Sequence, residues 1–588
     1  METKVCRLCG VRKTLDSFSK RGSGTKVRNT CRDCCKHLKA EKRHSDIKER
    51  NNSLVNSLLE LSRYDYSRLN LLSEDDFRSK VDYESFDYEW IKTKAIYELK
   101  EKGYLSNKTK YLTEDGIYLV LGESRGKFTK RAFFSFLNNF IECFDVKNIV
   151  HLGYALDDDG DLGYIWNDYS NLIFVANNVE LPFIYKNAPK ATIVTESVFI
   201  GNIECVNQHT ISAYTTQSIN TLDSYYYKNP TIVNSTRLEY FQKNDKNHAR
   251  FIASTGTTAI PHVTKKLKRG GSFNNLHASK YDRMKFAINY WNNGIVVVEI
   301  KNGVSYCYPL SVMYDDADGY STCYGEKFVS SKTVEDIRVC DVVLGDIHAP
   351  RLRKDAYAIL LDVLAYRKNT IKNVVLVGDV SDCRSLNPHV TDRPAVAEGD
   401  FLTEIAWVKR IVSDLSDLSS KVFMLLGNHE KWGVTFSERN AGIHSLINTL
   451  YNSVGCAVSY KPFGLGSNWF MHGDEQIFGA SGSVLNKISA TYPDTLNFIG
   501  HSHRPAISKN CVNVPCLCDY DQEYNDETNS NWKNGFTFVY NHHGKSYPVN
   551  LLIDSSGDKD TLSYCMREYY NTHPEIDFTP ARKIVINL

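Results

Sequence analysis

The 588-residue sequence has no long hydrophobic run, few cysteines for its length and almost no net charge. No stretch approaches the roughly 20 apolar residues of a membrane span, and the N-terminus, METKVCRLCG, lacks the apolar region of a signal peptide. We therefore expect no membrane partner. The formal charge of +2 provides no global attraction to nucleic acid, so any basic surface must be local.

The 16 cysteines lie mostly in apolar segments, apart from four that form a metal-binding pattern. This usage favours a reducing, cytoplasmic setting. Hydrophobic residues make up 42% and charged residues 24% of the chain, which is typical of a globular protein. A chain of 588 residues is too long for one ordinary core, so we expect two or three domains.

Polar residues that can bind metal follow five short apolar runs in the second half of the chain. The five segments are Gly-Asp-Ile-His at 345–348, Gly-Asp at 378–379, Gly-Asn-His-Glu at 427–430, His472, and Gly-His-Ser-His at 500–503. Short β-rich runs that end in glycine predict buried strands whose C-terminal loops converge. Ligand sites in open α/β sheets lie at those strand ends. Ordinary loop residues could account for one such segment, but not for five in this order.

The candidate ligands offer carboxylate, amide and imidazole groups without a thiolate. They are Asp346, His348, Asp379, Asn428, His472, His501 and His503. This mixture suits Mn²⁺, Fe or Zn²⁺ better than it suits a structural cysteine site. The set is too large for one tetrahedral ion and suits two ions that share a carboxylate. Two such ions can clamp a phosphoryl group and generate a hydroxide nucleophile.

The ordered series D-x-H, G-D, G-N-H-E, H and G-H-x-H, within residues 338–553, resembles the calcineurin-like metallophosphoesterase family. Within this family, the sequence resembles the DNA-repair nuclease branch more closely than the other branches. The resemblance implies two divalent ions, Mn²⁺ first, with Mg²⁺, Fe or Zn²⁺ as alternatives. One ion would be held by Asp346, His348 and His503. The other would be held by Asn428, His472 and His501, and Asp379 would bridge the two.

The same resemblance implies that His429 assists the leaving oxygen without binding metal, while a bridging hydroxide attacks in line. Asp379 and His429 are thus the predicted catalytic residues. Two details depart from the common family pattern. Glu430 replaces an aspartate, and His472 is followed by Gly473 and Asp474 instead of glycine and histidine.

The N-terminal segment contains Cys6-x2-Cys9 and Cys31-x2-Cys34 around a polar loop. Two such pairs predict a tetrahedral structural Zn²⁺ site, in which Cys35 or His37 could replace Cys34. The pattern is similar to treble-clef fingers of phage HNH-type endonucleases. Its basic flanks could bind phosphates. The alternative is a structural zinc clip that docks on protein.

The first half of the chain repeats the strand motifs of the second half. GIYLVLGESR at 116–125 parallels CDVVLGDIH at 340–348, and KNIVHLGY at 147–154 parallels KNVVLVGD at 372–379. This pattern predicts a duplication, although α/β units in general share strand-helix-strand order. The first copy lacks the ligands, because it has Glu123, Arg125, Tyr154, Thr257 and Ala259 at the corresponding positions. It reads as an inactive phosphoesterase-like domain.

We therefore predict an α/β fold with two tandem metallophosphoesterase-like β-sandwich/α domains, the first degenerate and the second active. The predicted boundaries are 1–37 for the zinc finger, 38–112 for a helical linker, 113–330 and 331–553 for the two domains, and 554–588 for a tail. An apolar stripe at Leu54, Leu58, Leu59 and Leu61 could serve homo-oligomerisation. In the segment 383–400, Arg384, His389 and Arg393 are candidates for binding substrate phosphate, or are plain loop charges.

The predicted function is two-metal-dependent hydrolysis of phosphodiester bonds in DNA, as an exonuclease or an endonuclease. A finger before a duplicated phosphoesterase is similar to the host-DNA-degrading phosphoesterases of T5-like bacteriophages, which would place the protein in the host cytoplasm. One alternative is a small-molecule or nucleotide phosphatase or phosphodiesterase. A further alternative is a non-catalytic DNA-binding or host-interaction protein.

Overall fold

The computed structural model comprises two compact units, residues 1–106 and 107–588. It describes residues 2–6, 11–20, 27–62, 69, 72–81, 86–101, 109–122, 130–153, 169–175, 191–207, 219, 229–243, 250–258, 291–387, 401–439, 449–474, 481–520, 532–555 and 562–563. Among the helices in these ranges, none is both long enough and apolar enough to cross a membrane.

The first unit begins with two short hairpins and continues into a long helix. β1 (Thr3–Val5) pairs antiparallel with β2 (Arg12–Thr14), and β3 (Phe18–Lys20) pairs antiparallel with β4 (Val27–Cys31). A 3-10 turn at Leu15–Ser17 connects them. The helices that follow are α1 (Arg32–Leu61), α3 (Glu74–Arg78) and α4 (Tyr88–Glu101). The second cysteine pair of the predicted finger therefore spans the end of β4 and the first turn of α1.

The leucine stripe on α1 is buried within this unit. Leu54, Leu58 and Leu59 have no exposed surface, because α1 packs against α4, while Leu61 is 39% exposed. The prediction that this stripe offers a surface for self-association is therefore wrong for three of its four members. An apolar helix face is covered by its nearest apolar neighbour, and here that neighbour lies in the same chain.

The five apolar runs predicted to be strands each form one. They are β21 (Asp341–Leu344), β22 (Asn373–Leu376), β23 (Lys421–Leu425), β26 (Asn468–Met471) and β27 (Leu496–Ile499). The first three lie parallel in one sheet of order β24-β23-β22-β21-β30-β31-β32. The remaining strands of that sheet are β24 (Ala457–Ser459), β30 (Asn534–His542), β31 (Lys545–Ser555) and β32 (Leu562–Ser563).

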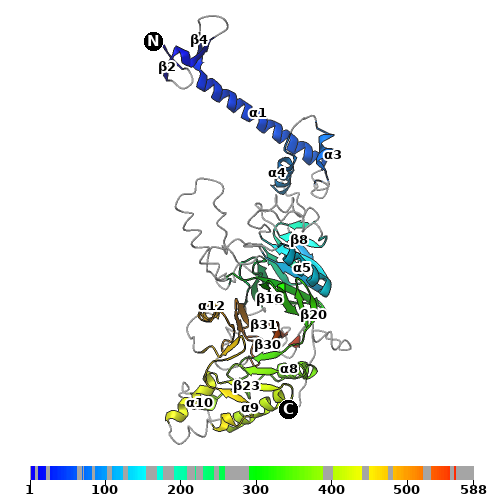
Figure 1. Ribbon diagram of the computed structural model, residues 1–588, viewed down its shortest axis with the longest axis vertical. Helices are drawn as coiled ribbons and strands as arrows, with labels where there is room; N and C mark the ends of the chain where they lie inside the picture. The colour runs from blue at the N-terminus through cyan, green and yellow to red at the C-terminus, as the bar shows by residue number, and fades with distance from the viewer. Residues whose placement is uncertain are drawn as a thin grey trace. The chain divides into compact units, whose positions relative to one another are not determined.

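Helices α8 (Lys354–Tyr366) and α9 (Phe401–Ser416) lie beside the sheet that contains β23 (Figure 1). Each buries a stripe at helical spacing, such as Val408, Ile411 and Leu415 on α9, as predicted for an amphipathic helix. α10 (Asn428–Arg439) starts within the Gly-Asn-His-Glu motif, and α12 (Ser481–Thr491) packs on β28 and β29.

β26 and β27 belong to a second sheet, which runs through both halves of the unit. Its order is β25 (Phe463–Leu465), β26, β27, β29 (Cys511–Asn513), β28 (Ala506–Ser508), β13 (Glu239–Lys243), β14 (Arg250–Ser254), β12 (Thr231–Val233), β11 (Ile203–Val206), β10 (Ser197–Ile200) and β5 (Thr109–Leu112). One core joins the two sheets as a sandwich: Val343, Val375, Val377, Phe470, Phe498, Val512, Val514 and Val539. The site must therefore form where strand ends of both sheets meet.

The first half has a sheet of the same type. Its order is β16 (Val304–Ser311), β15 (Gly294–Lys301), β6 (Gly116–Leu121), β7 (Val146–Leu152), β8 (Leu172–Val175) and β9 (Thr192–Val194), with α5 (Lys130–Phe144) after β6. As in the second half, an antiparallel hairpin flanks a run of parallel strands. β13 joins the halves by pairing with β28. This common order agrees with a duplication, which stays a prediction.

Three features of the sheets do not coincide with the predicted domain boundaries. β5 belongs to the shared sheet, so the helical linker ends before residue 109. A four-stranded sheet, β17 (Met313–Asp315), β18 (Gly319–Tyr324), β19 (Lys327–Ser330) and β20 (Val334–Asp336), spans the boundary at 330. β31 runs past 553 and pairs with β32. The boundaries predicted from composition therefore differ from the hydrogen-bonded limits of the sheets.

Candidate metal centre

The predicted ligands lie at the carboxyl ends of strands from both sheets. Asp346, His348 and His503 have ligand atoms within 4.8 Å of one another, and all three are buried. Nε2 of His348 lies 3.1 Å from Nε2 of His503, and the latter lies 3.4 Å from Oδ1 of Asp346. The structure thus brings together the first predicted ligand group from β21 and the loop after β27.

The second predicted group lies next to the first. Asp379, His472 and His501 also have ligand atoms within 4.8 Å of one another. Nε2 of His472 lies 2.9 Å from Oδ1 of Asn428 and 3.2 Å from Oδ2 of Asp379. Asp379 also lies 4.0 Å from Nε2 of His348 in the first group, which is the position expected of a bridging carboxylate.

In the neutral form of these rings, the hydrogen bonds place the proton on the outer nitrogen and leave a lone pair on the inner nitrogen. Nδ1 of His472 lies 2.8 Å from the carbonyl oxygen of Val377, which can only accept, so Nδ1 carries the proton. Nδ1 of His348 likewise faces the carboxylate of Asp382 at 3.2 Å. Each Nε2 then points at further acceptors. A cation between them removes this repulsion, so the donor set fits divalent metal ions.

Backbone strain gathers at the same place. Four of the predicted ligands have positive φ: His348 (51°), Asp379 (49°), His501 (65°) and His503 (56°). Residues without glycine's freedom hold such angles only where the surrounding structure imposes them, and functional sites are where this usually occurs. The strand ends are bent so that these side chains face one point.

Two motif glycines make room for the ligands. A Cβ on Gly378, whose φ is +105°, would lie 2.3 Å from Nδ1 of His472. A Cβ on Gly427 would lie 2.2 Å from Oδ1 of Asp379. Both contacts are impossible for a real side chain, so the glycines in Gly-Asp and Gly-Asn-His-Glu are required by the close approach of neighbouring loops.

His429 is held by Asp382, which the sequence analysis did not single out. Nδ1 of His429 donates to the carbonyl oxygen of Asp382 at 2.6 Å and lies 3.4 Å from its carboxylate. The same carboxylate bonds His348, so Asp382 connects the first ligand group to His429. The sequence does carry an indication of this role, because Asp382 follows Asp379 by three residues in the pattern Gly-Asp-x-x-Asp.

Charges in the site shift several pKa values. Burial would lower the pKa of His429, but Asp379 and Asp382 outweigh it and raise the pKa to about 9. Asp379 in the same way raises the pKa of His472 to about 10 against the effect of burial. Burial would raise the pKa of Asp346, but His503 and His472 lower it to about 2. The carboxylates therefore stay ionised at neutral pH.

Two buried glutamates support the loops from behind. Glu430 accepts hydrogen bonds from the backbone N–H groups of Asp379, Ser381 and Gly427 at 3.0, 2.8 and 2.8 Å. Glu430, which stands where the common family pattern has aspartate, therefore holds these two loop segments in position. Glu404, in the first turn of α9, accepts from the hydroxyl of Ser381 at 3.2 Å. Burial, with Asp382 nearby, raises the pKa of Glu404 to about 7.

Glu404→Gln is expected to change how stability depends on pH. Because the folded pKa of Glu404 is raised, its contribution to stability is fully present below its unfolded pKa and is lost as pH rises through about 7. Relative to Glu404→Gln, wild type should lose on the order of 3 kcal/mol between pH 5 and 8. Urea unfolding of both proteins at the two pH values measures this. Glu114→Gln, at an exposed position, is the control. A stability difference between wild type and Glu404→Gln that is the same at both pH values would contradict the assignment.

Not every predicted site residue can be placed. Arg384 begins a 3-10 turn, Arg384–Leu386, two residues after Asp382 and is partly buried. His389, Arg393 and Cys9 lie outside the described residues, as do most of the substituted positions of the first copy: Glu123, Arg125, Tyr154 and Ala259. Thr257 is described and is buried.

The N-terminal cysteines gather as predicted for those that the structure describes. Cys6, Cys31 and Cys34 have sulfur atoms within 4.8 Å of one another. The backbone N–H of Cys31 donates to the sulfur of Cys6 at 3.4 Å. Cys31 is the residue before α1, so Cys34 follows in its first turn. Among the alternatives for the last ligand, it is Cys34 that lies with the other two.

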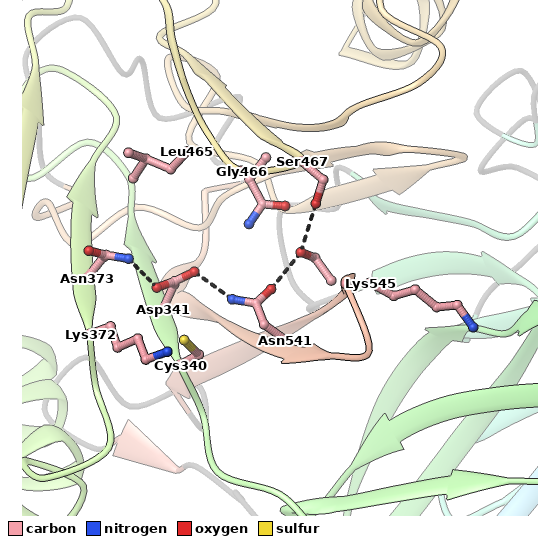
Figure 2. A pocket seen from close by; sticks show the side chains of 12 residues that line it. Cys340, Asp341, Lys372, Asn373, Leu465, Gly466, Ser467, Asn541 and Lys545 are labelled. Carbon is pink, nitrogen blue, oxygen red and sulfur yellow. Dashed lines mark hydrogen bonds between the residues drawn. The ribbon is translucent and has the colours of Figure 1, made fainter. Parts of the chain in front are cut away.

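The opposite end of the parallel strands carries a different pocket. Figure 2 shows it lined by residues that include Asp341, Asn373 and Asn541. Both oxygens of Asp341 are used, because the amides of Asn373 and Asn541 donate to them at 2.7 and 2.8 Å. This carboxylate therefore differs from those of the metal centre, which face ring nitrogens.

Comparison with known proteins identifies the second half of the chain. A protein-family model described as calcineurin-like phosphoesterase matches residues 342–566. These residues form a calcineurin-like phosphoesterase domain. Members of this family hydrolyse phosphoesters with divalent metal ions, in agreement with the donor set described above. The matched range of this calcineurin-like domain extends beyond the predicted boundary at 553.

Solved structures similar to the chain include Vps29 from Chaetomium thermophilum, with 13% identity, a TM-score of 0.22, and coverage of 37% of this chain and 93% of that one. A single mutant of Vps29 from Entamoeba histolytica has 13% identity, a TM-score of 0.21, and coverage of 36% and 99%. Vacuolar Protein Sorting 29 from Cryptosporidium parvum has 15% identity, a TM-score of 0.21, and coverage of 37% and 100%. No curated protein matches the sequence.

Proposed function

We propose that the calcineurin-like domain is a metal-dependent phosphodiesterase that cleaves DNA. The observation that carries the chemistry is the convergence of two ligand groups on Asp379, directly beside His429. Asp346, His348 and His503 would hold one divalent ion, Asn428, His472 and His501 would hold the other, and Asp379 would lie between the two. Bound ions, Mn²⁺ first, would supply Lewis acidity toward the phosphoryl oxygens.

His429 is placed to move a proton. Its Nδ1 proton is held by the carbonyl oxygen of Asp382 at 2.6 Å, which leaves Nε2 directed toward Asp379 at 3.9 Å. A pKa of about 9 keeps the ring protonated near neutral pH. Nε2 can therefore donate a proton to the leaving oxygen of a phosphodiester, which is the role of a general acid.

The DNA substrate rests on features outside the metal centre. The cysteine group formed by Cys6, Cys31 and Cys34, with Cys9 as the predicted fourth ligand, would hold a structural Zn²⁺. Basic residues surround it: Lys4, Arg12, Lys13, Arg32 and Lys36. A local basic surface binds phosphates without reading sequence. Lys13 forms an ion pair with Asp33 at 2.8 Å. We also propose Arg384, His389 and Arg393 as contacts for substrate phosphate.

Cleavage assays test the proposal directly. Linear duplex, single-stranded and covalently closed circular DNA are incubated with wild type in Mn²⁺, Mg²⁺ or EDTA, alongside bis-p-nitrophenyl phosphate. We expect metal-dependent cleavage of DNA, and cutting of the circle identifies an endonuclease. Cys31→Ser should weaken DNA cleavage at least about tenfold at physiological salt, because it removes the finger's phosphate contacts, and leave ester hydrolysis unchanged.

Other outcomes favour the alternatives. Hydrolysis of the small ester without any cleavage of DNA would overturn the DNA assignment and favour a nucleotide or small-molecule phosphodiesterase. Binding of DNA with no hydrolysis of either substrate in any metal would favour a non-catalytic DNA-binding protein.

A further inference from the structure

Two buried cysteines lie directly behind the metal ligand His503. Cys516 and Cys518 follow β29 on an extended segment that makes isolated bridges with Asn534 and Leu352. Side chains two residues apart in an extended segment point to the same side. Both cysteines have no exposed surface. The two thiols therefore face one place in the interior.

The imidazole of His503 completes this group. Its Nδ1 lies 3.6 Å from the sulfur of Cys518, and His503, Cys516 and Cys518 have ligand atoms within 4.8 Å of one another. In a tetrahedral zinc site with Zn–S near 2.3 Å and Zn–N near 2.0 Å, sulfur and nitrogen lie about 3.6 Å apart. The observed separation equals that edge.

The outer nitrogen of His503, Nδ1, has a different neighbour from the outer nitrogens of the other candidate ligands. The outer nitrogens of His348 and His472 face oxygen acceptors, the carboxylate of Asp382 and the carbonyl of Val377. The outer nitrogen of His503 instead faces sulfur. Trp532 packs against the ring with centroids 3.9 Å apart, which holds its orientation. One ring thus presents Nε2 to oxygen and nitrogen donors and Nδ1 to thiols.

We propose that Cys516, Cys518 and Nδ1 of His503 form a further metal site, selective for a thiophilic cation such as Zn²⁺ or Cd²⁺, that shares His503 with the candidate metal centre. Thiolate donors select Zn²⁺ and softer ions over Mn²⁺ or Mg²⁺, whereas the neighbouring centre offers carboxylate, amide and imidazole. When the neighbouring centre is empty, each thiol loses its proton and forms a sulfur–metal bond while the ring proton stays on Nε2, so two protons are released for each cation taken up. When both sites are filled, His503 would bridge them as an imidazolate, and its ring proton would be released as a third. No oxidation is involved.

The chain offers a matched control. Cys511 is also buried, five residues before Cys516, but it packs in an apolar core with Ile499 and Met471. Cys511→Ser therefore removes a buried thiol from the same region without touching the proposed site. The parent of all variants, called the Cys6→Ser protein below, also carries Cys9→Ser, Cys31→Ser, Cys34→Ser and Cys35→Ser, which together remove the predicted N-terminal thiolates from the signal.

The test is cadmium binding to chelator-treated, full-length protein. We expect the Cys6→Ser protein and its Cys511→Ser derivative to take up one more Cd²⁺ per chain, with near-ultraviolet thiolate-to-metal absorption, than the Cys516→Ser/Cys518→Ser derivative. The ¹¹³Cd NMR spectrum of the Cys6→Ser protein alone should contain a resonance shifted by sulfur ligation, which requires no variant in the domain. Equal uptake in all three proteins, or a spectrum without a sulfur-ligated resonance, would overturn the proposal. Neither readout depends on phosphodiesterase activity.

Discussion

His429→Ala should lower the hydrolysis of a phosphodiester with an alkoxide leaving group, such as a dinucleotide, by about 100- to 10,000-fold, the usual contribution of a general acid. The physical reason is that Nδ1 of His429 is anchored to Asp382 at 2.6 Å, so that only Nε2 is available to a leaving oxygen. Alanine removes that proton donor. The measurement is kcat for wild type and variant at saturating Mn²⁺.

Metal content separates two roles for this residue. His429 forms a group with His348 and Asp379 whose ligand atoms lie within 4.8 Å of one another, so it could in principle bind an ion itself. We expect His429→Ala to retain the metal content of wild type. A loss of one equivalent would show that His429 is a ligand. His543→Gln, at a partly exposed histidine in the β30–β31 turn, is the control and should retain full activity.

Asp379→Asn should remove at least one equivalent of divalent metal. It should also lower activity by more than about 100-fold, because loss of a residue that only supports a metal ligand lowers activity by up to about that factor. Asp379 lies 3.2 Å from His472 and 4.0 Å from His348, so it lies between the two groups. An amide in its place loses the negative charge that both ions would share. Metal analysis after dialysis, with kcat measured in parallel, tests this.

Asp341→Asn is the matched control for that experiment. Asp341 is also a buried carboxylate of the same sheet, but it lies at the opposite strand ends in the pocket of Figure 2, where two asparagine amides satisfy it. The variant should keep its metal and its activity. If Asp341→Asn and Asp379→Asn lost metal equally, the effect would be general destabilisation, and the bridging assignment would be wrong.

Much of the fold around the site could be predicted because it is local in the sequence. Each ligand follows an apolar run directly, and the runs before Asp346, Asp379 and Asn428 became the parallel strands β21, β22 and β23. Parallel neighbours end at the same edge, so residues far apart in sequence meet there. The glycines of the motifs carried a signal too, since Gly378 and Gly427 stand where a side chain would overlap a ligand.

Other features depend on contacts that no local pattern reveals. The leucine stripe of α1 is as apolar as predicted, but α4 covers it within the same unit. Asp382 was overlooked because its significance lies in reaching His348 and His429 at once. Composition could not place the limits of β5, β20 and β31 either, because strand pairing across the chain decides them.

The sequence by itself determined the ligand types, their order and the strands that present them, because these follow from residue chemistry and from short-range periodicity. Only the tertiary structure decided that β26 and β27 reach the site from a second sheet, that β13 joins the halves through β28, and that Cys518 stands behind His503. These are packing relations between segments distant in sequence. They are decided by which faces of the sheets cover each other, and that is a property of the whole chain.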